Sequence, residues 1–240
     1  MARLLRRIFG FTLLPLCVAV TLALLDMLRF SANTSTLISP QSFWLLAGFF
    51  AWLTIWFFMP QPIRSYVIAH ELTHALWGLL FGARIHAMRV SAHGGSVRLS
   101  KTNLLITLAP YFFPFYTVLV IILCCATRLL CGTIPMPLLW LFLIGLTWSF
   151  HLCFTIQSLL IEQPDIREYG ALFSYTLIYL FNLAGVGLWI VITTEATLWA
   201  FTQALIAQAY SAYATAIHHI YALTRGLLNL LSLLKTQMNK

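Results

Sequence analysis

The residues with the clearest chemical potential form the run His70-Glu71-Leu72-Thr73-His74, which has the pattern H-E-x-x-H. The apolar residues around it predict a helix, and a spacing of four residues places both imidazoles on one helical face. Two neutral imidazoles placed in this way can bind one Zn²⁺ ion. The carboxylate of Glu71 cannot reach the same ion, but it can hold and deprotonate a water molecule that the ion activates. The pattern therefore predicts zinc-dependent hydrolysis, with Glu71 as the general base and later the proton donor.

A third protein ligand is required, because catalytic zinc sites keep three protein ligands and one open position. Asp165 and His151 are candidates, but on one straight helix they would be about 21 Å apart at 1.5 Å per residue. Both can therefore ligate one ion only if the helix between them is broken. The remaining histidines are further candidates: His86, His93, His218 and His219. Spacing alone leaves the choice of the third ligand open.

The composition indicates a membrane protein. Of the 240 residues, 61% are hydrophobic and only 8% are charged, whereas a soluble domain carries about 25% charged residues. The formal net charge of +8 is spread thinly, without a run of Lys and Arg interleaved with aromatic residues, so we expect no nucleic-acid partner. Loops of this mild basic character suit the anionic headgroups of a lipid bilayer. The five cysteines are odd in number and include no C-x-x-C pair, so we expect neither a disulfide framework nor a thiolate zinc site.

Six apolar segments predict transmembrane helices, each of which needs about 20 mostly apolar residues. They cover residues 8–28, 43–59, 65–81, 103–127, 137–161 and 171–193. We expect the first to be a retained anchor, because no clear signal-peptide cleavage site follows it. The remainder, to residue 240, is less apolar and forms either one more span or an interfacial helix. The predicted fold is an all-α polytopic membrane protein of about six transmembrane helices, and we expect it in a bacterial inner membrane.

Residues 84–101 differ from the apolar segments, because apolar and polar residues alternate on both sides of Gly94-Gly95. This period of two predicts a β-hairpin insertion after the motif helix, with the two glycines between its strands. A free hairpin edge containing Val97 can pair with an unwound substrate strand. The alternative is a purely structural hairpin whose basic side chains lie at lipid headgroups. The following segment contains Pro110 and Pro114, which remove backbone donors and kink or break the helix.

These features together resemble the site-2 protease family of intramembrane zinc metalloproteases. The resemblance covers residues 65–170 and consists of H-E-x-x-H in a membrane segment, a hairpin, a proline-broken segment and a later Asp. In that family the third ligand is the Asp of an N-x-x-P-x-x-x-x-D-G pattern, and Asp165 stands at its position. Gln157 stands where the family has Asn, whereas Leu160 and Ile166 replace the family's Pro and Gly.

The resemblance implies that His70, His74 and Asp165 hold Zn²⁺ and that Gln157 contacts the substrate. His151 is a second candidate for substrate contact. The family cleaves transmembrane helices, so the implied partner is a transmembrane or membrane-anchored protein substrate. We divide the chain into an N-terminal transmembrane pair (1–64), a metalloprotease core with an Asp loop (65–170), and a C-terminal span with an interfacial or additional helix (171–240).

Three other functions are compatible with these residues. The first is a membrane zinc hydrolase that acts on a non-peptide substrate. The second is a non-catalytic protein in which His70, Glu71 and His74 line a polar or ion pathway, because ionisable residues at bilayer depth are commonly functional. The third is a protease relative that binds substrates without cutting them, which the intact Glu71 argues against.

Overall fold

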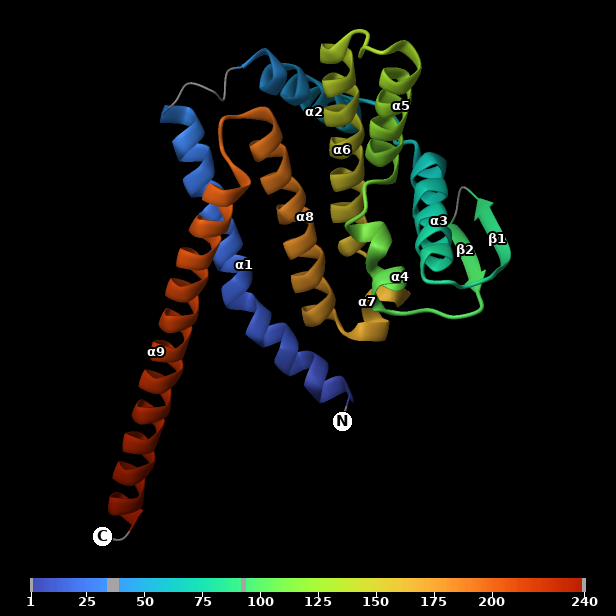
Figure 1. The fold of residues 1–240 in the computed structure, drawn as a ribbon. Helices are drawn as coiled ribbons and strands as arrows, with labels where there is room; N and C mark the ends of the chain where they lie inside the picture. The colour runs from blue at the N-terminus through green and yellow to red at the C-terminus, as the bar shows by residue number, and fades with distance from the viewer. Residues whose placement is uncertain (1, 34–38, 92–93, 239–240) are drawn as a thin grey trace.

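The computed structural model describes residues 2–33, 39–91 and 94–238, and almost all of its regular structure is helical (Figure 1). The elements follow one another as α1 (Ala2–Asn33), α2 (Pro40–Phe58), α3 (Ile63–Leu80), β1 (Ile85–Ser91), β2 (Gly94–Leu99), α4 (Leu104–Leu108), the 3-10 turn η2 (Ala109–Tyr111), α5 (Phe115–Cys131), α6 (Pro137–Leu159), α7 (Pro164–Tyr169), α8 (Ala171–Thr193) and α9 (Leu198–Met238). The prediction of a helical fold with one β-hairpin after the motif helix is confirmed.

Four of the described helices are long and apolar enough to cross a membrane: α1, α2, α6 and α8. A fifth span results if α4, η2 and α5 are counted together, although the chain bends by 84° between them. The motif helix α3 and the long helix α9 are not among these candidates. A polytopic arrangement is therefore supported, and the number of about six spans stays a prediction.

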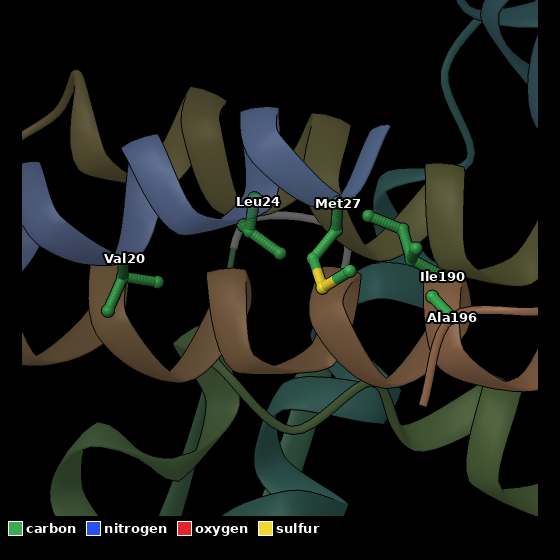
Figure 2. Close-up of a cluster of buried hydrophobic side chains, with 5 residues drawn as sticks. All are labelled: Val20, Leu24, Met27, Ile190 and Ala196. Carbon is green, nitrogen blue, oxygen red and sulfur yellow. The ribbon is translucent and has the colours of Figure 1, made fainter. Parts of the chain in front are cut away.

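The first helix packs against the end of the chain rather than against α2. Helix α1 lies along α8 and α9, whereas α2 lies along α6 (Figure 1). Figure 2 shows Val20, Leu24 and Met27 of α1 beside Ile190 of α8 and Ala196, which together form a buried apolar cluster. The N-terminal segment and the C-terminal segments therefore share one core.

The backbones of α2 and α6 come into near contact at two glycines. A Cβ atom on Gly48 would lie 1.9 Å from the carbonyl oxygen of Phe142, and one on Gly145 would lie 1.9 Å from that of Leu45. Small residues at a crossing allow two membrane helices to approach closely. Further along the same interface, the ring of Trp56 packs edge-on against Phe154 at 4.8 Å. This interface holds the end of α6 in place beside α3.

The hairpin forms, but its glycines do not make the turn. Gly94 pairs with Ser91 and Gly95 with Val90, so both glycines belong to β2 and the predicted turn position is wrong. The residues between the strands, 92 and 93, lie outside the described residues. Gly95 instead allows close approach to α3, because a Cβ there would lie 2.5 Å from Cγ of Glu71.

The two prolines break their segment as expected. Pro110 lies in η2, and Pro114 precedes the first residue of α5, where the 84° bend occurs. The stretch expected as the Asp165 loop instead contains α7, a helix of six residues. Pro164 starts that helix, where the missing N–H costs nothing, and Asp165 lies in its first turn, where the helix dipole favours a negative charge.

We expect the replacement Gly145→Ala to destabilise the protein by about 1–3 kcal/mol, the usual cost of overpacking. The added methyl group would meet a backbone carbonyl, which cannot rotate away. Thermal unfolding of the detergent-solubilised chain, followed by tryptophan fluorescence, measures the effect. Gly185→Ala is the matched control, because the nearest atom to its added Cβ is 4.0 Å away. Equal melting temperatures for the two variants would contradict the close crossing.

Candidate metal centre

Two histidines of α3 and one aspartate of α7 converge, although 91 residues separate His74 from Asp165 in the chain. The Nε2 atoms of His70 and His74 lie 3.6 and 3.4 Å from Oδ2 of Asp165. One donor atom from each residue lies within 4.8 Å of the others, so the group could hold a metal ion. Donors about 2.0–2.1 Å from a tetrahedral zinc ion are about 3.4 Å apart. The two histidine–carboxylate distances and the donor types therefore fit a metal ion shared by the three residues.

His74 is oriented by a backbone carbonyl. Its Nδ1 lies 2.9 Å from the carbonyl oxygen of Ile106 in α4. A carbonyl oxygen only accepts, so Nδ1 carries the hydrogen and donates it. When that ring is neutral, its Nε2 lone pair is free to ligate a metal ion in place of the contact with Asp165. Asn103 fixes the start of α4 by accepting a hydrogen bond from the Ile106 N–H through its side chain.

His70 is oriented by a tyrosine one helical turn earlier. Its Nδ1 lies 3.2 Å from the hydroxyl of Tyr66, which also hydrogen-bonds the hydroxyl of Ser158 on α6. The Tyr66 ring stacks on Phe154, with 4.7 Å between the centroids and 5° between the planes. A chain in which Nδ1 donates to Tyr66 and Tyr66 donates to Ser158 leaves the Nε2 lone pair of the neutral ring free to ligate a metal ion. Such outer partners select the tautomer of a ligating histidine.

Asp165 is held by a buried tyrosine. The hydroxyl of Tyr111, a residue with 0% of its surface exposed, donates to Oδ2 of Asp165 at 3.0 Å. The Tyr111 carbonyl in turn accepts a hydrogen bond from the amide of Asn182 on α8. Burial alone would raise the pKa of the Asp165 carboxyl, but hydrogen bonds and charge from His70 and His74, whose protonated rings donate through Nε2 when no metal ion is bound, hold that pKa below its usual range. The carboxyl is therefore ionised at neutral pH, as a metal ligand must be.

Glu71 lies beside the three candidate ligands without joining them. It is 6% exposed, and Gly95 of β2 covers it so closely that a Cβ there would lie 2.7 Å from Oε1. The absence of a side chain at Gly95 therefore lets the strand pass directly over the carboxylate. This places a potential general base between the candidate ligands and the hairpin.

An open cleft of about 480 Å³ contains this whole arrangement. It is lined by the motif residues of α3, by Gly95, Val97 and Leu99 of β2, and by the start of α7. The N–H of Ser100 donates to the carbonyl of Arg84. Because backbone groups alternate along a strand, the N–H groups of Leu99, Val97 and Gly95 point away from β1. The edge of β2 away from β1 therefore carries these three N–H groups, and Gly95, Val97 and Leu99 also line the cleft.

The other residues singled out in the sequence lie elsewhere. Gln157 donates to the side chain of Gln61 at 3.2 Å and does not line the cleft, so the expected substrate contact has no support in its position. His151 is buried and lines a separate cavity of about 20 Å³ behind His70. The remaining ligand candidates do not join the metal-binding group: His86, His218 and His219 are exposed, and His93 lies outside the described residues.

Four residues of this site were missed in the sequence: Tyr66, Gly95, Tyr111 and Ser158. Tyr66 could have been found, because it precedes His70 by four positions and so lies on the same helical face. Tyr111 and Ser158 lie in apolar stretches where nothing in the pattern distinguishes them from packing residues. Their contacts depend on the placement of η2 and α6 against α3.

We expect Tyr66→Phe to weaken metal binding about 10–100-fold, the usual cost of losing an outer partner of a ligating histidine. The ring and its stacking on Phe154 remain, and only the hydroxyl that orients His70 is removed. A competition titration with a zinc chelator, on the purified chain, measures the affinity. Tyr116→Phe is the control, because its hydroxyl bonds the Ser65 carbonyl at the start of the same helix. A loss of affinity shared equally by both variants would contradict the role of Tyr66.

No protein-family model matches this chain, and neither do any curated proteins or solved structures. The chemistry of the site is therefore inferred from its own residues and distances. Those residues form a group of two imidazoles and one carboxylate suited to a metal ion, with a buried glutamate beside it and the strand β2 along the cleft.

Proposed function

We propose that this protein is an intramembrane zinc metalloprotease that hydrolyses a peptide bond within or near the bilayer. The observation that supports this best is the convergence of Asp165 on His70 and His74, because Asp165 lies far from the motif in the sequence. A polar pathway needs no third group at ligand distance from the two imidazoles. A buried Glu71 next to the same three residues adds the general base that hydrolysis requires.

Each residue of the cleft has a separate role in the proposed reaction. A bound zinc ion would supply Lewis acidity for the attacking water and the scissile carbonyl. Glu71 takes a proton from the water as its oxygen attacks the carbonyl carbon. Glu71 then returns that proton to the amide nitrogen as the C–N bond breaks. His70, His74 and Asp165 keep one side of the site polar, and Gly95 leaves room for the Glu71 carboxylate.

The proposed substrate is a transmembrane or membrane-anchored protein, presented as an extended strand. A protease needs an extended substrate, and main-chain hydrogen bonds to a free strand edge can hold one. The outward N–H groups of Gly95, Val97 and Leu99 supply such an edge along the cleft. This arrangement supports a peptide substrate over a small non-peptide one. The proposed location is a bacterial inner membrane, with the chain as a multi-pass protein.

Metal analysis and cleavage together test the zinc site. We expect about one zinc ion per native chain, most of it lost in Asp165→Ala. Glu71→Gln should keep the metal and lower cleavage about 10²–10⁴-fold, since it removes only the base. Metal is measured by elemental analysis of detergent-purified protein, and cleavage with a panel of single-span membrane proteins co-reconstituted in vesicles.

His86→Ala is the control for both measurements, because that histidine is exposed on β1. It should change neither metal content nor cleavage. Zinc retained in full by Asp165→Ala would remove Asp165 from the ligand set. A native chain that holds no zinc after zinc is supplied would contradict the protease and favour the polar pathway.

The role of the strand edge is tested by Val97→Pro. Proline has no N–H, so the variant should lower cleavage by about tenfold, the cost of about 1.4 kcal/mol for one lost hydrogen bond. The zinc content should stay unchanged, because Val97 touches no ligand. Val97→Ala is the matched control, since it shortens the side chain but keeps the N–H. Cleavage unaffected by the proline would rule out pairing at this position.

A further inference from the structure

A second cleft, of about 570 Å³, lies where the first turns of α1 meet α7 and the start of α8. Three arginines line it: Arg6 and Arg7 from α1, and Arg167 from α7. Glu168 is the one carboxylate among its lining residues. The cleft is therefore lined by three cationic side chains, from two distant parts of the chain, and by one anionic side chain.

Among the described residues, none of the three arginines forms an ion pair with Glu168, the carboxylate of the cleft. Arg6 donates to the backbone carbonyl of Glu168 and lies over the ring of Tyr169, 4.7 Å from its centroid. Arg7 is exposed and has no hydrogen-bond or ion-pair partner among the described residues. Arg167 pairs with Glu162 at 3.4 Å, but both side chains are mostly exposed, and such pairs are weak. Guanidinium groups in this state suit the oxygen atoms of a phosphate.

The remaining walls of the cleft are apolar. Ala171, Leu172 and Phe173 come from the first turn of α8. Leu172 packs against α1 at Gly10, where a Cβ would lie 2.9 Å from Cγ of Leu172. The close crossing leaves the arginines directly beside this apolar surface. A ligand that fits both parts carries a phosphate and a hydrocarbon chain.

The position of the cleft agrees with such a ligand. The candidate spans of α1 and α8 begin at Leu4 and Ala171, so the cleft lies where both helices start to be apolar enough for a membrane. Lipid headgroups lie at the ends of an apolar span that crosses a bilayer, and basic pockets between membrane helices at that depth bind anionic lipids. A soluble anion would use the arginines but would leave the apolar wall uncovered.

We propose that this cleft binds the phosphate headgroup of an anionic phospholipid, with Arg6, Arg7 and Arg167 as its contacts and the start of α8 against its acyl chains. The bound lipid bridges α1 and α7. Since α7 also carries Asp165, the lipid braces the helix that completes the metal-binding group. The binding site itself does not depend on the proposed protease activity, and its test needs no substrate.

Native mass spectrometry of the detergent-purified full chain tests the site, with phosphatidylglycerol and phosphatidylcholine as competing lipids. The native chain should retain phosphatidylglycerol at least tenfold better than phosphatidylcholine. The double variant Arg7→Gln/Arg167→Gln should lose that preference. The control Arg225→Gln/Lys235→Gln removes the same charge from α9, outside the cleft, and should retain it.

Two results would overturn the proposal. One is an equal retention of the two lipids by the native chain. The other is an equal loss of preference in the cleft and control variants, which would assign the effect to general surface charge. Inorganic phosphate, added as a third competitor, separates a lipid from a free anion. Phosphatidylglycerol should stay bound in its presence, whereas full displacement would assign the arginines to free phosphate.

The stabilisation of α7 by the bound lipid is tested separately, by thermal unfolding. Phosphatidylglycerol should raise the melting temperature of the native chain above that in phosphatidylcholine, and the double variant should lose this difference. Asp165→Ala separates the two proposals, because it removes the metal ligand and leaves the arginines in place. It should still prefer phosphatidylglycerol tenfold, even if no zinc binds to any form of the chain.

Discussion

The structure depends on keeping two imidazoles and a carboxylate together in a chain with very few charges. Only 8% of the residues are charged, and an ionised group taken out of water is costly unless it is paired and hydrogen-bonded. Asp165 meets this requirement through His70, His74 and the hydroxyl of Tyr111. Each of these partners comes from an element that must be held at a fixed distance from α7. The packing of the neighbouring helices keeps those elements in place.

Three further helices, α4, α6 and α8, contribute hydrogen bonds that hold the site residues. Helix α6 supplies Ser158 to the hydrogen-bond chain behind His70, and α6 is itself held by its close crossing with α2. Helix α4 supplies the Ile106 carbonyl behind His74. Helix α8 supplies Asn182 to the carbonyl of Tyr111. Both imidazoles and the carboxylate therefore have outer partners that fix which atom faces the centre.

The breaks in regular helical structure lie next to the candidate metal site. The break at Pro110 and Pro114 turns the chain so that Tyr111 reaches Asp165, and the start of α7 at Pro164 brings Asp165 to the end of α6. Broken helices at membrane depth are tolerated where protein covers the freed backbone groups. Here that covering comes from α3, α7 and α8, so the breaks and the polar cluster share the same neighbours.

The sequence by itself predicted a membrane protein, and it determined the helical character, the hairpin, the broken segment and the motif His70-Glu71-Leu72-Thr73-His74. These follow from composition and local periodicity, which act over a few residues. Spacing left the third candidate ligand open, and the resemblance to a family pointed to Asp165; the sequence also assigned Gly94-Gly95 to a turn, which is wrong, and Gln157 to the substrate, which stays a prediction. Only the tertiary structure brought Asp165 to the histidines, placed Gly95 over Glu71 and paired Gln157 with Gln61. These positions depend on how helices far apart in the chain pack against one another, and no local pattern of residue types contains that information.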